Sequence, residues 1–315
     1  MMRRFALLWG LLSGLSAAAA AQTSLASEKL AEGVWATRTP GGANAGWFTV
    51  GDVVFAVDAG MSPEVGSALV EEIQKTTGRK PRYLLVTHAH RDHAGGAPAF
   101  AAAGAQIVSS ERAAAGILSV LGEAAPSAQG KSASSKTPAG SVLMTVSERC
   151  LFVGGERRRA EIYYLGPGHT QGDLVVVLPA DGILFAGDLA CNGVLPYLRS
   201  PDVDPKGWEA NLARLSPLKI QKMVPGHGAI GPPEGIAQTA AYLRHVDAIA
   251  VSFVLGNVPE SLYEAQLNLP ENAIEGVSVT PDHIANVKAV CQFEEASRAA
   301  PSKAPTPGPT PSRKP

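Results

Sequence analysis

Four residues that commonly bind metals fall within six consecutive positions of this 315-residue chain. The segment HAHRDH begins at His88 and follows a short apolar run. Alternate side chains of an extended chain point the same way, so His88 and His90 can bind one cation. The turn that follows directs Asp92 and His93 toward a second cation. Imidazole and carboxylate are ligands that Zn²⁺ accepts, so the segment predicts a zinc site at the end of a strand.

Three further candidate ligands lie in loops that follow strand-like runs. His169 and His227 belong to the Gly/Pro turns GPGHT and PGHG, and Asp188 ends the apolar run ILFAGD. A carboxylate that ends an apolar run needs a cation to offset its loss of hydration. The two remaining histidines, His245 and His283, lie in helical contexts and are interpreted as ordinary polar residues.

These motifs, in this order, resemble those of the metallo-β-lactamase superfamily over about residues 34 to 255. The resemblance also includes the segment FAVDAG around Asp58. It implies an α/β fold, a four-layer αββα sandwich in which two mixed sheets pack face to face, with a dinuclear zinc site along one edge. By the same resemblance, one metal is held by His88, His90 and His169, the other by Asp92, His93 and His227, and Asp188 bridges the two. Asp58 either braces the ligand loop or is an ordinary turn residue.

The predicted site favours hydrolysis without a nucleophilic side chain. Two cations that share one water lower its pKa toward neutrality, so a metal-bridging hydroxide can attack a carbonyl. We expect Asp92 to orient this nucleophile and to pass on its proton. Three serines, Ser62, Ser109 and Ser110, have no neighbouring base in the sequence pattern.

Four alternatives for the function stay open at this point. An aspartate like Asp188 is typical of the thioesterase and lactonase branches, which favours a small ester, thioester or lactone as substrate. Third-subclass β-lactamases carry a serine beside this position, whereas this chain reads DLACN and lacks a nearby lysine. A β-lactamase is nevertheless the second hypothesis, because β-lactams are met outside the cytoplasm. A persulfide dioxygenase with a single iron and a non-catalytic accessory protein are the other two.

The two ends of the chain differ in composition from the rest. Two arginines, an apolar run too short to span a membrane and the sequence AAA before Gln22 predict a signal peptide over residues 1–21. We expect a domain over 22–298, with its core at about 34–255 and a helical part at 256–298. Residues 299–315 are rich in proline and predict a disordered tail. The mature protein is therefore expected in the periplasm or outside the cell, without a membrane span.

Charge and cysteine content exclude some partners. The chain has 27 basic and 28 acidic residues, and loss of the two leader arginines leaves a net charge of about −3. Nucleic-acid binding requires a basic face, so the expected partner is a small-molecule substrate. The run Arg157 to Arg159 is interpreted as a solvated turn. Cys150, Cys191 and Cys291 allow at most one intramolecular disulfide, and the oligomeric state stays open.

Hydrophobic periodicity predicts alternating strands and helices. Strands are expected at 34–39, 46–50, 53–58 and 106–109, with a hairpin at 175–178 and 183–185. Helices are expected at 64–77, 98–103, 233–255 and 282–295, and a further helix from Ser110 to about Leu121. Residues 122–141 lack periodicity, which predicts a mobile loop or, as the alternative, a lid over the metals.

Overall fold

Two sheets packed face to face form the centre of the protein. The computed structural model describes residues 25–123, 143–154 and 158–299. Within these residues one sheet has seven strands, in the order β1-β2-β3-β4-β5-β6-β7, and the other has five, in the order β12-β11-β10-β9-β8. Antiparallel and parallel pairs occur in both, for example β3 with β4 and β4 with β5 in the first sheet. Both sheets are therefore mixed, as predicted.

The strands and helices have the following bounds. The first sheet contains β1 (Ser27–Ala31), β2 (Val34–Arg38), β3 (Asn44–Val50), β4 (Val53–Val57), β5 (Tyr83–Leu85), β6 (Gln106–Ser110) and β7 (Leu143–Val146). The second contains β8 (Arg149–Gly154), β9 (Arg158–Tyr164), β10 (Leu174–Leu178), β11 (Ile183–Gly187) and β12 (Lys222–Pro225). The helices are α1 (Pro63–Thr77), α2 (Arg91–Ala94), α3 (Ala97–Ala102), α4 (Ala114–Glu123), α5 (Pro205–Leu215), α6 (Glu234–Leu255), α7 (Tyr263–Leu267) and α8 (Pro281–Ala299), with short 3₁₀ turns η1 (Glu260–Leu262) and η2 (Pro270–Asn272).

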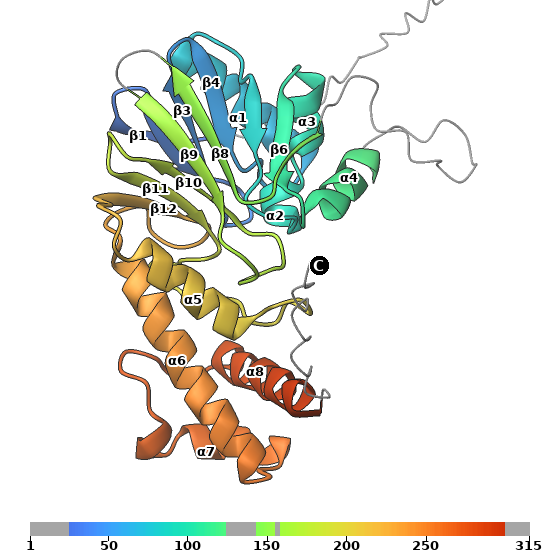
Figure 1. Cartoon of the computed structure of the whole chain (residues 1–315), viewed down its shortest axis with the longest axis vertical. Coiled ribbons are helices and arrows are strands. Elements are labelled where there is room, and N and C mark those ends of the chain that lie inside the picture. Colours follow the sequence, from blue (N-terminus) through green and yellow to red (C-terminus); the bar gives the residue numbers. More distant parts are fainter. Residues whose placement is uncertain (1–24, 124–142, 155–157, 300–315) are drawn as a thin grey trace, which may run out of the picture.

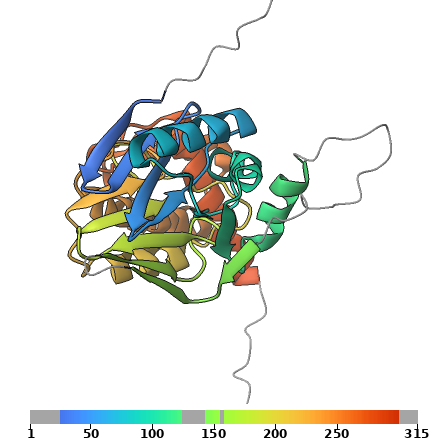
Figure 2. The ribbon, with the colours of Figure 1, turned by 90° about the horizontal axis from the view of Figure 1, so that it is seen from above.

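Helices cover the outer face of each sheet, which gives the predicted four-layer αββα sandwich. In Figure 1 α5, α6 and α8, coloured yellow to red, lie below the sheets, and Figure 2 shows α1 over the first sheet. Three apolar clusters separate the four layers. One lies between α1, α3, α4 and the first sheet, one between the two sheets, and one between the second sheet and α5, α6 and α8.

Continuous apolar runs in the central strands follow from this layering. In β4, Val54 and Ala56 belong to the cluster under the helices, whereas Phe55 and Val57 face the other sheet. The strand β10 reads LVVVL and is buried at every position. A strand with both faces covered must be apolar on both, so its sequence does not alternate.

The ends of α1 explain why this predicted helix forms where it does. The Ser62 side chain accepts a hydrogen bond from Val65 N at the N-terminus, and Pro63 occupies the first turn, where a missing N–H costs nothing. Gly78 ends the helix in the left-handed conformation, with φ of 74°. The structure confirms the predicted helix at this position, and the same holds for the helices near 98–103, 233–255 and 282–295.

Two interpretations of the sequence were wrong. Ser110 does not open a helix, because it is the last residue of β6, and α4 begins at Ala114. Its hydroxyl donates to Gly172 O and accepts from Ala113 N, so it joins the two sheets instead. Arg158 is not solvated, because its guanidinium pairs with Asp181 and also donates to backbone carbonyls of the first sheet. The pattern of charges alone could not reveal these distant acceptors.

Several other predictions fall outside the part of the chain that the structure describes. They are the signal peptide, the Pro-rich tail and most of the loop 122–141. Within the described residues, no helix is long and apolar enough to cross a membrane. The cysteines Cys150, Cys191 and Cys291 are all unpaired thiols in this structure, so no disulfide joins them.

Candidate metal centre

All seven predicted ligands come from strand ends at one edge of the sandwich. His88 and His90 follow β5, and Asp92 and His93 lie in the short helix α2 directly after them. The other three follow β9, β11 and β12 of the second sheet; they are His169, Asp188 and His227. The centre therefore lies where the two sheets meet, and each sheet contributes to it.

The ligand atoms fall into two adjacent groups. One consists of His88, His90, His169 and Asp188, and the other of Asp92, His93 and His227. Within each group the candidate ligand atoms all lie within 4.8 Å of one another. Asp188 also reaches the second group, because its Oδ1 lies 3.2 Å from His93 Nε2 and its Oδ2 3.7 Å from His227 Nε2. The structure thus brings the predicted ligands together, and their assignment to particular ions stays a prediction.

The first group is buried and its imidazoles are neutral. His169 Nε2 lies 3.3 Å from Asp188 Oδ2 and 3.0 Å from His90 Nδ1. Burial lowers the pKa of His88 and His90, and it lowers the pKa of His169 to about 4, in each case against the opposing pull of Asp188. Neutral rings keep the nitrogen lone pairs that a cation requires.

The second group is partly exposed, and the pKa values of its two histidines are raised. His227 Nε2 lies 2.9 Å from Asp92 Oδ2, and this hydrogen bond raises the pKa of His227. Burial acts to lower the pKa of His93, but the carboxylates Asp188 and Asp58 outweigh it and raise that pKa. A metal that binds here must therefore displace protons from the rings.

Unpartnered buried atoms test whether these residues fit a cation. His88 Nε2, His93 Nε2 and Asp188 Oδ1 are buried and lack a hydrogen bond of adequate geometry among the described residues. An unpaired buried polar atom costs free energy, and three that point into one small space are unusual in a folded protein. A divalent cation would satisfy all three, so the side chains present fit metal binding.

Asp58 braces the ligand segment, which confirms one of the two alternatives for this residue. Its carboxylate accepts hydrogen bonds from Thr87 N at 2.8 Å and Thr87 Oγ1 at 2.9 Å, and its Oδ2 lies 2.8 Å from His93 Nδ1. A carboxylate in this place fixes the ring of His93 and leaves Nε2 directed at the metal position. Asp58 has a positive φ of 60°, a conformation that Asp and Asn tolerate better than other residues.

A second buried acid supports the turn that carries His169. The Asp173 carboxyl group accepts from Thr170 N and Thr170 Oγ1, each at 2.8 Å. Burial raises the pKa of Asp173 to about 8, so this group is largely protonated at neutral pH. Asp173 was missed in the sequence, although its position four residues after the histidine in GHTQGD could have indicated a turn-bracing acid.

Glycines allow the close contacts around the centre. A Cβ at Gly96 would lie 2.1 Å from Ala59 O, and one at Gly226 would lie 1.8 Å from Asp188 Oδ1. Real side chains cannot approach so closely, so any other residue at these two positions would displace the Ala59 carbonyl or the Asp188 carboxylate. The Gly-rich sequences after the HAHRDH segment and before His227 are therefore requirements of the site.

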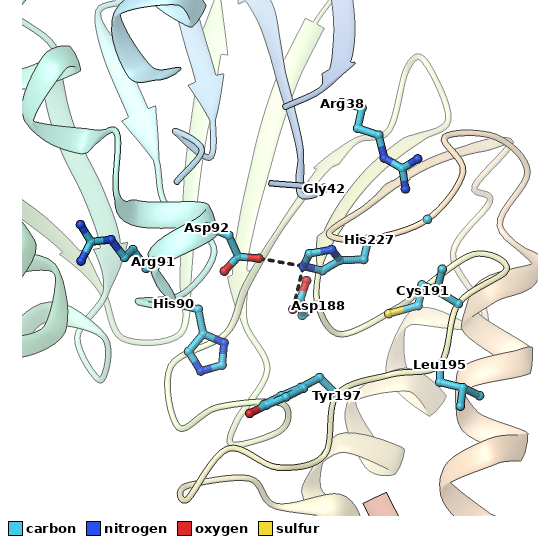
Figure 3. Close-up of a pocket in the computed structure, with 12 residues that line it drawn as sticks. Arg38, Gly42, His90, Arg91, Asp92, Asp188, Cys191, Leu195, Tyr197 and His227 are labelled. Atoms are coloured by element: carbon cyan, nitrogen blue, oxygen red, sulfur yellow. Dashed lines mark ion pairs between the residues drawn. The ribbon is translucent and has the colours of Figure 1, made fainter. Parts of the chain in front are cut away.

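Four of the candidate ligands, His90, Asp92, Asp188 and His227, line an open pocket of about 540 Å³. Figure 3 shows Asp92, Asp188 and His227 at its centre, with Tyr197 below and Arg38 above. The pocket is lined by Arg38, Gly42, His90, Arg91, Asp92, Asp188, Cys191, Val194, Leu195, Tyr197, His227 and Gly228. One wall is mostly apolar, and the opposite rim carries a guanidinium.

Other sequence candidates lie outside the ligand groups. His245 and His283 belong to neither group, as predicted. Cys191 lines the pocket, but burial, with a smaller contribution from Asp188, raises the pKa of its thiol, so it remains protonated. Besides Asp173, the pocket residues Arg38 and Tyr197 were missed in the sequence, because single residues at a strand end and in a loop form no motif.

A four-layer αββα sandwich with a histidine and aspartate cluster at one edge defines a class of metal-dependent hydrolases. The sequence model of the Metallo-beta-lactamase superfamily matches residues 38–227, more than half of the chain, and the protein belongs to this superfamily. The match includes all seven candidate ligands and ends at the last of them.

Relatives with assigned names agree with this membership. The chain is 28% identical over 193 residues to a metallo-beta-lactamase type 2 of Bacillus sp. (strain 170), which covers 60% of this chain and 67% of the relative. It is 30% identical over 175 residues to the 2,4-dinitroanisole O-demethylase subunit alpha of Nocardioides sp. (strain JS1661), which covers 55% of this chain and about half, 49%, of that relative.

Solved structures show the same fold. A metallo-beta-lactamase from Pontibacter korlensis superposes with a TM-score of 0.56 at 26% identity, covering 70% of this chain and 99% of that one. The metallo-beta-lactamase FIM-1 from Pseudomonas aeruginosa, in its mono-zinc form, gives a TM-score of 0.54 at 21% identity over 70% of this chain and 95% of that one. The second likeness concerns the fold alone.

Proposed function

We propose that the protein is a dinuclear zinc hydrolase that attacks the carbonyl of a small ester, thioester or lactone. The observation that carries this proposal is the pair of adjacent ligand groups joined by Asp188 at the floor of an open pocket. His88, His90 and His169 would hold one zinc and Asp92, His93 and His227 the other, with Asp188 between them. Two bound zinc ions would supply an activated water and a Lewis acid for the carbonyl oxygen.

The side chains around the metals have separate tasks in this proposal. Asp92 is partly exposed to the pocket and, despite the opposing effect of burial, its hydrogen bond with His227 keeps its pKa low. It is therefore ionised at neutral pH and can orient the attacking water and receive its proton. His88 and His169 are fully buried and face the metal position from the side away from the substrate.

The walls of the pocket favour a substrate with an apolar part and an anionic part. Val194, Leu195 and Tyr197 offer an apolar surface beside the first ligand group. Arg38 is exposed on the opposite rim, and its guanidinium has no hydrogen bond or ion pair to another described side chain. A free guanidinium beside a zinc site suits a carboxylate or another anionic group of the substrate.

Hydrolysis of β-lactams is the second candidate function. One of the two relatives and both solved structures given above carry the name metallo-beta-lactamase, and a β-lactam carries a carboxylate that Arg38 could bind. The aspartate at position 188 and the cysteine at 191 favour the ester, thioester and lactone substrates instead. An iron-dependent dioxygenase is the remaining alternative and differs in its metal.

One screen separates these candidates. The metal content of the protein is measured as purified, and the same sample is assayed against nitrocefin, an acyl-homoserine lactone and an acyl-glutathione thioester. The proposal expects about two zinc ions per chain and hydrolysis of the thioester or lactone well above that of nitrocefin. Preference for nitrocefin would select the β-lactamase, and a single iron with oxygen consumption would select the dioxygenase.

We also propose that the protein is exported and acts in the periplasm or outside the cell. The basic start, short apolar run and AAA before Gln22 support cleavage of residues 1–21. Mass spectrometry of the protein from its native host should find Gln22 at the N-terminus. Recovery of a chain that retains Met1 would overturn the proposed location.

A further inference from the structure

A loop between β11 and α5 forms part of both the pocket wall and the support of a candidate ligand. Residues 192–204 of this loop include the apolar lining residues Val194, Leu195 and Tyr197. The backbone carbonyl of Tyr197 lies 3.1 Å from His169 Nδ1. A carbonyl oxygen can only accept, so His169 Nδ1 donates to Tyr197 O and Nε2 faces Asp188.

The peptide groups on both sides of Tyr197 are held by one side chain from the C-terminal helix. Asn286 of α8 donates from Nδ2 to Pro196 O at 2.8 Å, and its Oδ1 accepts from Leu198 N at 3.1 Å. The amide thus pairs with the backbone of the loop in the way that a neighbouring strand would. Asn286 is only 1% exposed, so these hydrogen bonds do not compete with water.

Further contacts fix the Asn286 amide itself. Its Nδ2 also lies 3.0 Å from the hydroxyl of Tyr242 on α6, and that hydroxyl lies 2.9 Å from His283 Nδ1. All three side chains are buried. An Asn amide that donates two hydrogen bonds and accepts one is nearly saturated, so it has a single preferred orientation.

From these contacts we infer that Asn286 is a positioning residue for the metal centre, acting through the Tyr197 carbonyl on His169. The inference rests on the proposed metal centre. It assigns a task to α8, which lies beyond residues 38–227 matched by the superfamily model. Figure 1 shows α8 below the sheets and against α6, on the side of α5. The C-terminal helix would then fix both the orientation of one ligand and the position of the apolar pocket wall.

The chemistry of the amide makes the inference specific. Asn286→Asp places a second acceptor opposite Pro196 O, and Asn286→Ala removes both hydrogen bonds to the loop. Either change frees the Tyr197 peptide to rotate, and His169 then loses the acceptor that fixes its tautomer. Loss of a hydrogen-bond partner behind a metal-binding histidine typically lowers metal affinity by roughly 10- to 100-fold.

The experiment compares Asn286→Ala and Asn286→Asp with Val290→Ala in the full chain. Val290 lies one turn further along α8, is fully buried and belongs to the apolar cluster between α8, α6 and the second sheet. Val290→Ala therefore weakens the packing of α8 and leaves both hydrogen bonds between Asn286 and the loop in place. Cobalt(II) binding is followed by absorption spectroscopy and by chelator competition, and the His169 tautomer by ¹⁵N NMR of the metal-free protein.

In both Asn286 variants, we expect the affinity of the first ligand group for cobalt to fall by roughly 10-fold or more. We also expect both variants to contain a mixture of His169 tautomers. Val290→Ala should keep the wild-type cobalt spectrum and the single Nδ1–H tautomer. Equal effects in Val290→Ala would reduce the role of Asn286 to general packing and overturn the inference. So would wild-type spectra in the Asn286 variants. Failure of the wild-type chain to bind cobalt would instead refute the proposed metal centre.

Discussion

The two ligand groups differ in burial, charge and support. The first lies under the apolar pocket wall and consists of neutral histidines around Asp188, with His88 and His169 completely buried. The second opens to the pocket, where the side chains of Asp92 and His227 are 23% and 31% exposed and paired with each other. Under the proposed function, the buried first group would keep its ion, whereas the second group would meet the substrate.

Each group also has its own buried acid behind it. Asp58 touches the ring of His93 in the second group directly. Asp173 touches only the backbone and hydroxyl of Thr170, in the turn that carries His169 of the first group. We therefore expect changes at Asp58 to alter metal binding and changes at Asp173 to alter mainly the stability of the fold.

The largest effect is expected where the two groups meet. Asp188→Asn removes the charge that both groups share while it keeps the volume of the buried side chain. Metal content should fall below two ions per chain, and kcat/KM should fall by several orders of magnitude, because the activated water depends on both ions. Metal analysis and steady-state kinetics check this. The control His245→Ala, at an exposed histidine, should alter neither the metal content nor kcat/KM. An Asp188→Asn protein with two metals and full activity would refute the bridging assignment.

A smaller effect is expected from Asp58→Asn. Asparagine tolerates the positive φ at this position, so the substitution removes charge without backbone strain. The affinity of the second group for zinc should fall by roughly 10- to 100-fold, because His93 loses its anionic partner. Chelator titration monitors both ions. If the substitution weakened the ion held by the first group instead, the assignment of Asp58 to the second group would be wrong.

The rim of the pocket provides a test of substrate orientation. Arg38→Gln should raise KM about 10-fold, the equivalent of about 1.4 kcal/mol, for substrates with a carboxylate and leave neutral analogues unchanged. Arg82→Gln is the control, since Arg82 is exposed before β5, whose other end leads to the ligands. Equal effects on charged and neutral substrates would show that Arg38 does not recognise an anion.

Asp173 should affect stability in a pH-dependent way. Its pKa is raised from 3.8 to about 8, so the folded state keeps a proton that the unfolded chain has already lost. The contribution of Asp173 to the free energy of unfolding is fully present below about pH 4 and is lost as the pH rises through about 8. Asp173→Asn can donate to Thr170 Oγ1 and accept from Thr170 N without a charge. Urea titrations should show that the free energy of unfolding of Asp173→Asn, relative to that of the wild type, rises between pH 5 and pH 9. If the two proteins instead showed the same pH dependence, Asp173 would not be protonated in the folded state.

The clustering of the candidate ligands could be predicted from the sequence because short segments determine their positions. The HAHRDH segment and the turns around His169 and His227 carry their ligands within a few residues of a strand end, where local geometry fixes direction. The four-layer fold was implied by the resemblance of these motifs to a known superfamily. Apolar runs such as LVVVL in β10 agree with it, because a strand covered on both faces is apolar at every position.

Long-range polar contacts could not be predicted in this way. Arg158 pairs with an acid 23 positions later, and Asn286 reaches a loop about 90 positions earlier. Neither residue belongs to a periodic pattern, and an isolated Arg or Asn is usually a surface residue. Only the three-dimensional arrangement shows that both are held by several hydrogen bonds.

Metal stoichiometry, measured together with hydrolysis on one preparation, tests the central claim most directly. Protein freed of metal by a chelator is titrated with zinc, and bound zinc and turnover of the preferred ester, thioester or lactone are recorded at each step. We expect no turnover without metal and full turnover as the content approaches two zinc ions per chain. Hydrolysis by the metal-free protein, or full turnover already at one zinc ion per chain, would contradict this expectation.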